Sequence, residues 1–550
     1  MAKHSRFGLT RAGLPCAALL VLGLGLTPLA AHAQTYTDLH DFNINAGDPF
    51  TFVNGRLAQG RDGNFYSESN QGGSFLKGTV FQLTPSGTVT IIYSFTGNAD
   101  GQFPEGGLTL GADGNFYGDA KTGGAGNNGT VFKVTPSGTL ALLHTFTNKG
   151  DGLNPMYSLI LNPNGNFYGA TSQGNNSAPE TIFQVAPSGT FKTVRTLTTA
   201  QGFSGGQLSQ GSDGNLYGGT NAGGANGLGT AFKMTPGKVV TVVHDFNGTD
   251  GAFAAFGLVQ ASDGKFYGAT KGGGSANAGV IYSLTSSGMF TVLHNLNGTS
   301  DGSTPFGQLL VASDGNLYGT AVSGGTTFVN CGTIFKVTPA GAYSVVHNFD
   351  RTSGCNPEEQ LIQGTDGLLY GLVTGGGNHD GRGGVFYSLD LGLPAFAGLV
   401  TTTAAEGANV GVLGQGFSGA SVVKFGGVQA TAISVTGSTF INVKVPAGAL
   451  TGPVTVTTGS TTLTSTQTFL VKPTITTFAP PNGPVGTSVT INGTGLSQVT
   501  KLTFNGTSTT FTVNSDTQIA TTVPTGATTG KIAVTTTGGR AVTAVKFTVN

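Results

Sequence analysis

The sequence predicts an all-β protein, a seven-bladed β-propeller of four-stranded blades followed by two immunoglobulin-like β-sandwiches. Two repeats support this prediction: a unit of about 50 residues that recurs seven times, and a different module in two copies at the end of the chain. Within each unit the apolar runs are only four to seven residues long and alternate with turn signals, which leaves no room for helices of ordinary length. Hydrophobic residues make up 38% of the 550 residues, enough to fill cores.

The first 33 residues are predicted to be a secretory signal peptide. Three basic residues precede an apolar stretch, 17–29, that is too short to span a bilayer comfortably, and Ala31-His32-Ala33 has the small-x-small cleavage pattern. No later stretch has the composition of a membrane span, so we expect no transmembrane segment after signal removal. The protein is therefore expected to be exported, to the extracellular space, the cell surface or the periplasm.

The net charge of zero hides an uneven distribution. Residues 393–550 hold seven basic and two acidic residues, a net charge of +5, whereas residues 34–392 are net −8. Phosphate backbones require a basic stripe, and the chain has none, so no nucleic-acid partner is expected. The acidic region is where the sequence favours a ligand site.

Each repeat unit contains three recognisable blocks. An Asp-Gly-Asn-Phe-Tyr-like block is followed by a Gly-Thr-Val-Phe-like block and then by a Leu-His-x-Phe-like block, with one more short strand ahead of them. Four antiparallel strands in about 50 residues is the size of one propeller blade. The seven first blocks, spaced 49 to 52 residues apart, begin at Asp62, Asp113, Asn164, Asp213, Asp263, Asp314 and Asp366.

The order of the blocks predicts how the propeller, residues 35–391, closes. We name the strands of a blade A to D from inside to outside. The chain begins with a lone D-type block, 35–42, and the last repeat ends without one. The N-terminal strand should therefore be the outermost strand of the seventh blade, which removes two sheet edges. Strand B has Phe or Leu beside Tyr on opposite faces, so it should be buried on both faces between neighbouring blades.

Histidines recur on strand D and could be mistaken for a metal site. Strand D is peripheral, so these side chains lie far from one another, whereas a metal ion needs all its ligands within about 2–2.5 Å. We expect them to be packing or edge residues. No metal site and no cofactor are predicted, and calcium remains an option that no motif supports. The histidines are His40, His144, His244, His294 and His347.

The D–A and B–C loops emerge on one face of the propeller and carry the candidate binding residues. Four Asp-Gly pairs in the D–A loops would form an acidic rim that binds cations or hydroxyl-rich ligands. The alternative is that Asp-Gly simply makes turns. The predicted binding residues are Asp100, Asp151, Asp250 and Asp301.

Two further features concern cysteine and catalysis. Cys331 and Cys355 flank the start of strand C and the end of strand D of one hairpin, so export would allow them to form a disulfide. Residues 202–206 match Gly-x-Ser-x-Gly, but that motif needs a strand-to-helix turn, and here it lies in a D–A loop. No catalytic residue is predicted.

The tail modules, 393–471 and 472–550, follow the same course. Val410-x-Val412-x-Gly414-x-Gly416-Phe417 in the first matches Val489-x-Ile491-x-Gly493-x-Gly495-Leu496 in the second. Both copies resemble IPT/TIG immunoglobulin-like domains. The 50-residue units resemble the GloVer tandem repeat of bacterial secreted "choice-of-anchor" proteins, with their Asp-Gly-Asn-Phe-Tyr-Gly and Leu-His-x-Phe elements. The resemblance implies an exported bacterial protein and supplies no catalytic residues.

Three functions fit these observations. The first is a secreted or cell-surface binding protein that presents the D–A/B–C face to a carbohydrate or to another surface protein. The second is a polysaccharide- or lactone-active propeller enzyme, which would need acidic or histidine side chains that converge at the channel mouth. The third is a purely structural envelope component. The oligomeric state is not predicted.

Overall fold

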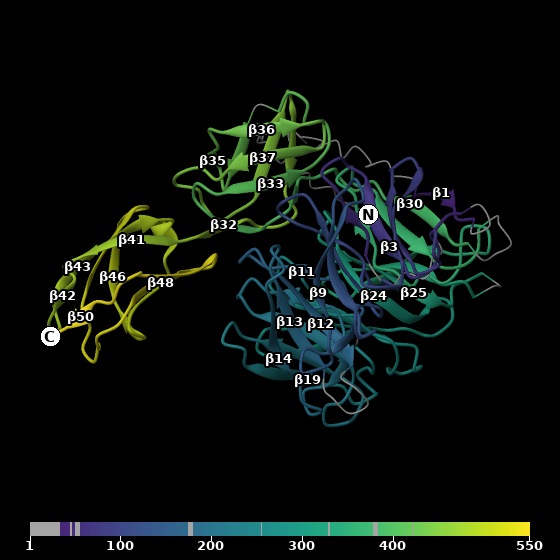
Figure 1. Cartoon of the computed structure of the whole chain (residues 1–550), viewed down its shortest axis with the longest axis horizontal. Helices are drawn as coiled ribbons and strands as arrows, with labels where there is room; N and C mark the ends of the chain where they lie inside the picture. Colours follow the sequence, from purple (N-terminus) through teal and green to yellow (C-terminus); the bar gives the residue numbers. More distant parts are fainter. Residues whose placement is uncertain are drawn as a thin grey trace, which may run out of the picture. The chain divides into compact units, whose positions relative to one another are not determined.

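The computed structural model describes residues 34–43, 47–49, 56–173, 180–254, 256–327, 330–377, 383–420 and 422–550. The predicted signal peptide, 1–33, lies outside the described residues. The described chain is all-β, with a single turn of 3-10 helix, η2 (Leu496–Gln498), as its helical element (Figure 1). Within that part of the chain, no helix has the length and apolar character needed to cross a membrane.

The repeats form seven antiparallel sheets, numbered here in chain order, and the strands of each run from A to D. Sheet 1 contains β2 (Ala58–Gln59), β3 (Phe65–Ser69), β4 (Thr79–Leu83) and β5 (Val89–Ser94). Sheet 2 contains β6 (Thr109–Leu110), β7 (Phe116–Ala120), β8 (Thr130–Val134) and β9 (Leu140–Thr145). Sheet 3 contains β11 (Ile160–Leu161), β12 (Phe167–Gln173), β13 (Thr181–Val185) and β14 (Phe191–Thr196), with β10 (Leu153–Pro155) also paired to β12.

The remaining sheets repeat this order. Sheet 4 contains β16 (Ser209–Gln210), β17 (Leu216–Ala222), β18 (Thr230–Met234) and β19 (Val240–Asp245), with β15 (Phe203–Gly205) also paired to β17. Sheet 5 contains β20 (Val259–Gln260), β21 (Phe266–Thr270), β22 (Val280–Leu284) and β23 (Phe290–Asn295). Sheet 6 contains β24 (Ser303–Val311), β25 (Leu317–Ser323), β26 (Thr333–Val337) and β27 (Tyr343–Asn348). Sheet 7 contains β28 (Ile362–Gln363), β29 (Leu369–Val373), β30 (Val385–Asp390) and β1 (Thr35–Asp41).

The first strand of the chain lies in the last of these sheets. β1 pairs antiparallel with β30, from Thr35 opposite Asp390 to Asp41 opposite Val385 (Figure 1). It occupies the outer edge of sheet 7, which is the position predicted for it from the order of the blocks.

The Asp-Gly-Asn-Phe-Tyr block is a self-contained turn between strands A and B. In sheet 1, Asp62 accepts hydrogen bonds from the backbone N–H and the side-chain amide of Asn64 and, at 2.8 Å, from the hydroxyl of Tyr66. Gly63 adopts a positive φ of 84°, which glycine tolerates and other residues rarely do. The same tyrosine–carboxylate bond recurs in five of the other sheets, at 2.7 to 2.9 Å, on Asp113, Asp213, Asp263, Asp314 and Asp366.

The tyrosines of this block also join neighbouring sheets. The ring of Tyr66 stacks on Phe116 of the next sheet with centroids 4.1 Å apart, and Tyr117 stacks on Phe167 at 3.8 Å. The contact also links the last sheet to the first, because the centroids of Tyr370 and Phe65 are 4.4 Å apart. Strand B is accordingly buried on both faces, as predicted.

Hydrogen bonds between inner strands follow the same order from sheet to sheet. The side-chain oxygen of a strand A glutamine accepts a backbone N–H from the A–B turn of the preceding sheet. Ser212 donates to Gln260 and Ser313 donates to Gln363, each at 2.8 Å. The bond from Thr365 in sheet 7 to Gln59 in sheet 1, at 3.1 Å, is the equivalent contact between the last and first sheets.

The D–A loops dock on the B–C loops of the preceding sheet. In five of the D–A loops a residue with positive φ donates its N–H to the carbonyl of the residue just before the strand C glycine. Phe103 donates to Lys77 at 2.9 Å, and Phe253 donates to Leu228 at 2.8 Å. At the junction of sheets 6 and 7, where Asn356 donates to Cys331, a disulfide also joins Cys331 and Cys355, the pair named from the sequence.

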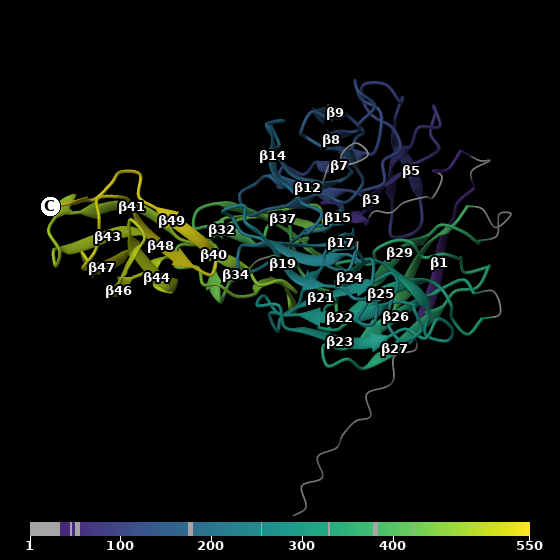
Figure 2. The same ribbon diagram turned by 90° about the horizontal axis from the view of Figure 1, so that it is seen from below.

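The tail forms two β-sandwich modules with the same strand order (Figure 2). One sheet of the first module contains β31 (Gly398–Leu399), β33 (Asn409–Leu413), β37 (Phe440–Lys444) and β36 (Ile433–Thr436). The other contains β35 (Val428–Gln429), β34 (Val422–Phe425), β38 (Val454–Thr458) and β39 (Thr461–Thr464). In addition, β32 (Thr403–Ala405) pairs in parallel with β40 (Leu470–Lys472). One sheet of the second module contains β41 (Thr474–Ala479), β43 (Ser488–Thr494), β47 (Gln518–Thr522) and β46 (Phe511–Ser515). The other contains β45 (Thr507–Thr509), β44 (Lys501–Phe504), β48 (Ile532–Thr536) and β49 (Gly539–Val542). In addition, β42 (Asn482–Gly483) pairs in parallel with β50 (Thr548–Val549). Each module has its own apolar core.

We expect the disulfide to stabilise the junction of sheets 6 and 7. Alanine stands at the equivalent loop positions of sheet 5, Ala278 and Ala252, so the double variant Cys331→Ala, Cys355→Ala introduces residues that the repeat already uses. Loss of the cross-link should lower the free energy of unfolding by about 3 kcal/mol. Denaturant unfolding measures this, and the reduced wild type should match the variant. Equal stability of variant and oxidised wild type would contradict a stabilising role.

Candidate functional site

The aspartates predicted as an acidic rim each bond to the strand D that precedes them. The Nε2 atom of a strand D histidine, or the hydroxyl of Tyr93, lies within hydrogen-bond distance of the carboxylate. The pairs are Tyr93–Asp100 (2.9 Å), His144–Asp151 (3.2 Å), His244–Asp250 (3.0 Å) and His294–Asp301 (2.9 Å), and His40–Asp48 (2.9 Å) has the same form.

The same carboxylates also accept backbone N–H groups of their own loops, from Thr96, Thr147, Asn247 and Asn297. Burial opposes ionisation of Asp100, but the hydrogen bonds from Thr96 and Tyr93 outweigh it and lower the pKa of its carboxyl. Each aspartate therefore holds its own loop, and the four are not brought together in one cluster. A ligand-binding role for them stays a prediction.

The strand D histidines pack between the outer strands of neighbouring sheets. His144 stacks on Phe191 with ring centroids 3.5 Å apart, and His244 stacks on Phe290 at 3.7 Å. In the described part of the chain, no three His, Cys, Asp or Glu side chains gather closely enough to hold a metal ion.

One histidine lacks its carboxylate partner. In the loop after His347 the aspartate, Asp350, lies three residues earlier than the aspartate of the other loops. Ser353 occupies the position from which the aspartate bonds to the histidine in those loops. Asp350 accepts hydrogen bonds from Thr352 and Ser353, and the buried Nε2 of His347 has no hydrogen-bond partner among the residues that the structure describes. Burial lowers the pKa of His347 to about 4, against a smaller opposing effect of Asp350.

A second set of acids, which sequence reasoning missed, lies where strand A begins and strand B ends. The D–A and B–C loops emerge at this same end, so these acids belong to the predicted binding face. They come from three sheets that are consecutive through the contact of sheet 7 with sheet 1. We call Glu68, Glu105, Asp119, Glu358 and Glu359 the inner carboxylate cluster.

Glu68 on β3 reaches from sheet 1 to sheet 2. Its side chain is fully buried, and its Oε2 accepts the N–H of Gly107 at 3.1 Å. The space exists because Gly118 has no side chain, since a Cβ atom there would lie 2.1 Å from the other carboxylate oxygen. Burial, and secondarily the charge of Asp119, raise the pKa of Glu68 well above its usual range, against the opposing bond from Gly107.

Asp119 on β7 is 1% exposed, and neither of its carboxylate oxygens has a hydrogen-bond partner in the described residues. A Cβ atom on Gly106 would meet both Asp119 and the backbone of Tyr157, so the carboxylate lies between sheets 2 and 3. Burial, and secondarily the charge of Glu105, raise the pKa of Asp119 well above its usual range. Glu105 itself forms an ion pair with Lys121 at 3.1 Å.

Sheet 7 contributes Glu358 and the buried Glu359, whose two carboxylate oxygens are also without partners in the described residues. Burial, and secondarily Glu358, raise the pKa of Glu359 well above its usual range. The hydroxyl of Tyr387 is buried and likewise unpartnered, and its pKa is raised by burial and by Glu359, so the two groups interact. Burial lowers the pKa of Lys271, and Glu358 opposes that shift.

The signal that could have found this cluster is departure from the repeat. Two residues after the strand B tyrosine, the other sheets carry Ala170, Gly219, Ala269, Thr320 and Leu372. Glu68 and Asp119 stand at that position in sheets 1 and 2. An alignment of the repeats position by position would have singled them out.

Exposed apolar side chains are displayed on the loops of the same face. Phe75 and Leu76 are 55% and 72% exposed in the B–C loop of sheet 1, and Phe203 and Phe253 are partly exposed in the D–A loops that lead to sheets 4 and 5. Leu76 has a φ of +55° and Phe253 a φ of +65°. Such angles are uncommon for residues with bulky side chains. The equivalent positions hold Asn127, Gly227 and Asn277 for Leu76, and Phe103, Asn154, Thr304 and Asn356 for Phe253.

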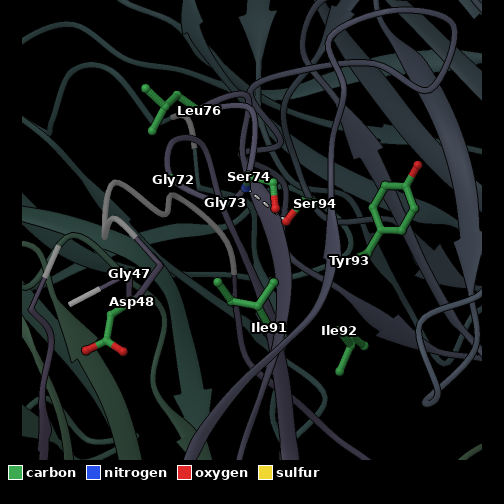
Figure 3. Close-up of a pocket in the computed structure, with 10 residues that line it drawn as sticks. All are labelled: Gly47, Asp48, Gly72, Gly73, Ser74, Leu76, Ile91, Ile92, Tyr93 and Ser94. Atoms are coloured by element: carbon green, nitrogen blue, oxygen red, sulfur yellow. Dashed lines mark hydrogen bonds between the residues drawn. The ribbon is translucent and has the colours of Figure 1, made fainter. Parts of the chain in front are cut away.

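A cavity of about 520 Å³ lies beside the exposed Leu76. Gly47 and Asp48 border it on one side and the loop of Gly72–Leu76 on another, with Ile91 of β5 between them (Figure 3). None of the inner carboxylates lines this cavity. Leu76 thus borders a concave surface at the junction of sheets 7 and 1.

The comparison with family models identifies the repeats. The model described as the Gloeobacter/Verrucomicrobia repeat matches residues 26–207 and 203–423, which together exceed half of the chain. The chain belongs to the Gloeobacter/Verrucomicrobia repeat family. An IPT/TIG domain model matches residues 473–549. The resemblances of the repeats and of the second sandwich are thereby confirmed.

The other comparisons do not indicate the function of this member of the Gloeobacter/Verrucomicrobia repeat family. No curated protein matched the chain. Among solved structures, a fungal alcohol oxidase of the AA5 family in complex with copper is 14% identical, with 94% of this chain and 99% of that chain covered and a TM-score of 0.43. A gluconolactonase from Xanthomonas campestris is 14% identical (53% and 88% covered, TM-score 0.35), and a surface glycan-binding protein from Prevotella bryantii is 17% identical (26% and 38% covered, TM-score 0.21).

Replacing Asp119 with alanine should stabilise the protein. Alanine stands at the equivalent positions 170 and 269, and the variant removes a buried carboxylate that has no hydrogen-bond partner in the described part of the chain. Relief of that desolvation should raise the free energy of unfolding by about 1–3 kcal/mol. Urea unfolding at neutral pH measures the change. A loss of stability would show that Asp119 supports the fold.

Restoring the missing aspartate should make the protein less sensitive to acid. The pKa of His347 is about 4 in the folded state and about 6.5 when unfolded. The wild type therefore loses stability as pH falls from about 6.5 to 4, by up to about 1.4 kcal/mol per pH unit. The double variant Asp350→Asn, Ser353→Asp places in this loop the residues found at the equivalent positions 247 and 250. It should reduce the dependence of the free energy of unfolding on pH. Unfolding at several pH values tests this, and an unchanged slope would contradict it.

Proposed function

We propose that this protein is an exported binding protein, secreted or held at the cell surface, and that its D–A/B–C face takes a carbohydrate. In this proposal the seven sheets are the blades of a closed propeller, residues 35–391. The contact of the Tyr370 ring with the Phe65 ring and the hydrogen bond from Thr365 to Gln59 support closure, because they repeat between sheets 7 and 1 the contacts made between other neighbours. The predicted signal peptide supports export.

The observation that carries the proposal is the pair of strained, exposed side chains. Leu76 occupies a positive φ position where other repeats have asparagine or glycine, and Phe253 occupies one where they have asparagine, threonine or phenylalanine, at a cost of about 1 kcal/mol or more each. Exposed apolar side chains that the fold does not require indicate a contact surface. The flat C–H face of a sugar ring fits aromatic side chains such as Phe203 and Phe253, and the acids and amides of the same face suit its hydroxyls.

The tail modules complete the proposed organisation. The strand order shared by both modules supports two IPT/TIG-like sandwiches, at residues 393–471 and 472–550, although the family model covers only the second. We propose that these sandwiches carry the propeller and that Asp100, Asp151, Asp250 and Asp301 shape its rim through their bonds to strand D. Another surface protein is the alternative partner for the same face.

A polysaccharide- or lactone-active enzyme is the second candidate. The raised pKa of Glu68, Asp119 and Glu359 favours it, because a general acid must hold its proton near neutral pH. Release of reducing ends or opening of lactones by the purified protein, abolished in Glu359→Gln, would support this candidate.

Binding of the full chain to a glycan array, followed by titration with the best glycan, tests the proposed function. The double variant Leu76→Asn, Phe253→Asn introduces residues that the repeat already uses there and should weaken binding at least about tenfold through the lost apolar contact. The control Met289→Thr removes an exposed apolar side chain in a C–D hairpin, where Thr88 and Thr139 are equivalent, and should bind as the wild type does. Absence of any glycan binding would favour a purely structural component.

A further inference from the structure

We infer that the inner carboxylate cluster is a binding site for a protonated amine, and that the preferred ligand is an oligosaccharide of amino sugars with free ammonium groups. This inference rests on the proposed carbohydrate-binding function of the D–A/B–C face and specifies its ligand.

The cluster has more acids than counter-charges. Glu68, Asp119 and Glu359 make no ion pair with any residue that the structure describes. The nearby lysines are already engaged. Lys121 pairs with Glu105, and the ammonium of Lys271 lies 4.5 Å from the ring centre of Phe256 and 4.8 Å from that of Phe306. A positive charge from outside the described chain would complete the site.

The polar groups of the cluster are buried and unpartnered, which separates them from ordinary surface acids. Both oxygens of Asp119 and of Glu359, and the hydroxyl of Tyr387, have no hydrogen-bond partner in the described chain. Tyr387 stands where most sheets have phenylalanine, as with Phe81 and Phe335, so its hydroxyl is an addition to the repeat. Leaving such groups unpaired costs about 1–3 kcal/mol each, which a ligand that bonds to them recovers.

An ammonium group suits this arrangement better than a metal ion. A calcium ion needs six to eight oxygens around one centre, and no three acidic or imidazole groups of the described residues gather in that way. The carboxylates are distributed over sheets 7, 1 and 2 instead. One ammonium needs only one or two carboxylates, so amines spaced along an oligomer match acids spaced over neighbouring sheets.

Binding of the amine should be coupled to the release of protons from the protein. Burial, with the mutual repulsion of Glu105, Asp119 and Glu68 and of Glu358 and Glu359, raises the pKa of the buried carboxyls, so they bind protons more readily than exposed carboxyls do. Tyr387 is neutral, and the nearby cations are Lys121, Lys271 and Arg56, whose backbone pairs with Gly107 beside Glu68. An arriving ammonium would displace protons from the carboxyls. Affinity should therefore increase with pH as long as the amine remains protonated.

The experiment compares two probes on the full-length mature chain by isothermal titration calorimetry. They are an oligomer of glucosamine with free amines and its fully N-acetylated form, which has the same ring and no charge. We expect the free-amine oligomer to bind at least about tenfold more tightly. Titration in two buffers of different ionisation enthalpy should show that only this probe releases protons.

Two variants locate the site. Asp119→Asn and Glu359→Gln should each weaken binding of the free-amine oligomer about tenfold and leave binding of the acetylated form unchanged. The matched control is Asp245→Asn, which removes the same charge from the end of β19. Its Oδ1 accepts the N–H of Ala225, and Asn295 and Asn348 accept the equivalent bonds in sheets 5 and 6, so the fold tolerates asparagine there.

The outcomes separate this inference from the proposed function. Equal binding of both probes would overturn the amine site and leave carbohydrate binding standing. Binding of neither probe would overturn the amine site, while glycan binding on the array would still preserve the wider proposal. Preference for the free amine that survives both Asp119→Asn and Glu359→Gln would also overturn the inference, because the charge would then be recognised elsewhere.

Discussion

Stacking of a strand B tyrosine on the strand B residue of the next sheet is the contact on which the rest of this fold depends. It recurs as Tyr66 on Phe116 and Tyr217 on Phe266, and it joins sheet 7 to sheet 1 as Tyr370 on Phe65. The Asp-Gly turn holds the tyrosine hydroxyl, so one five-residue block fixes both the hairpin and the spacing of neighbouring sheets. Because strand B is buried on both faces, any charged side chain within it needs an explanation outside packing.

The architecture was readable from the sequence because it is periodic. Seven copies of one block, and a lone strand D block at the start, were sufficient to predict that β1 completes the sheet of β30. The positions of Asp151 and Asp250 in the D–A loops were predictable for the same reason. Their histidine partners were also visible in sequence, six or seven residues upstream, yet the recurring pair of residue types was interpreted as two separate features.

The inner carboxylate cluster was not readable in this way, because its members are far apart in the chain. Glu68 and Asp119 come from successive repeats, and Glu359 comes from the last one. Their sheets are consecutive only because sheet 7 contacts sheet 1. Their residue types carry no motif spacing, and only their burial, opposite glycines such as Gly118, distinguishes them from the many surface acids. The features specific to this chain are thus departures from its own repeat, whereas the features shared by all repeats build the scaffold.

The pairing of β1 with β30 also bears on the order in which the molecule can assemble. The strand that completes sheet 7 is the first of the described strands to leave the ribosome, and its partner, β30, is made within the seventh repeat, after the other six have been synthesised. Contacts between such distant segments form slowly, because the intervening chain must first be ordered. The repeat region therefore stays incomplete, with an open sheet edge at each end, until synthesis has passed the last repeat.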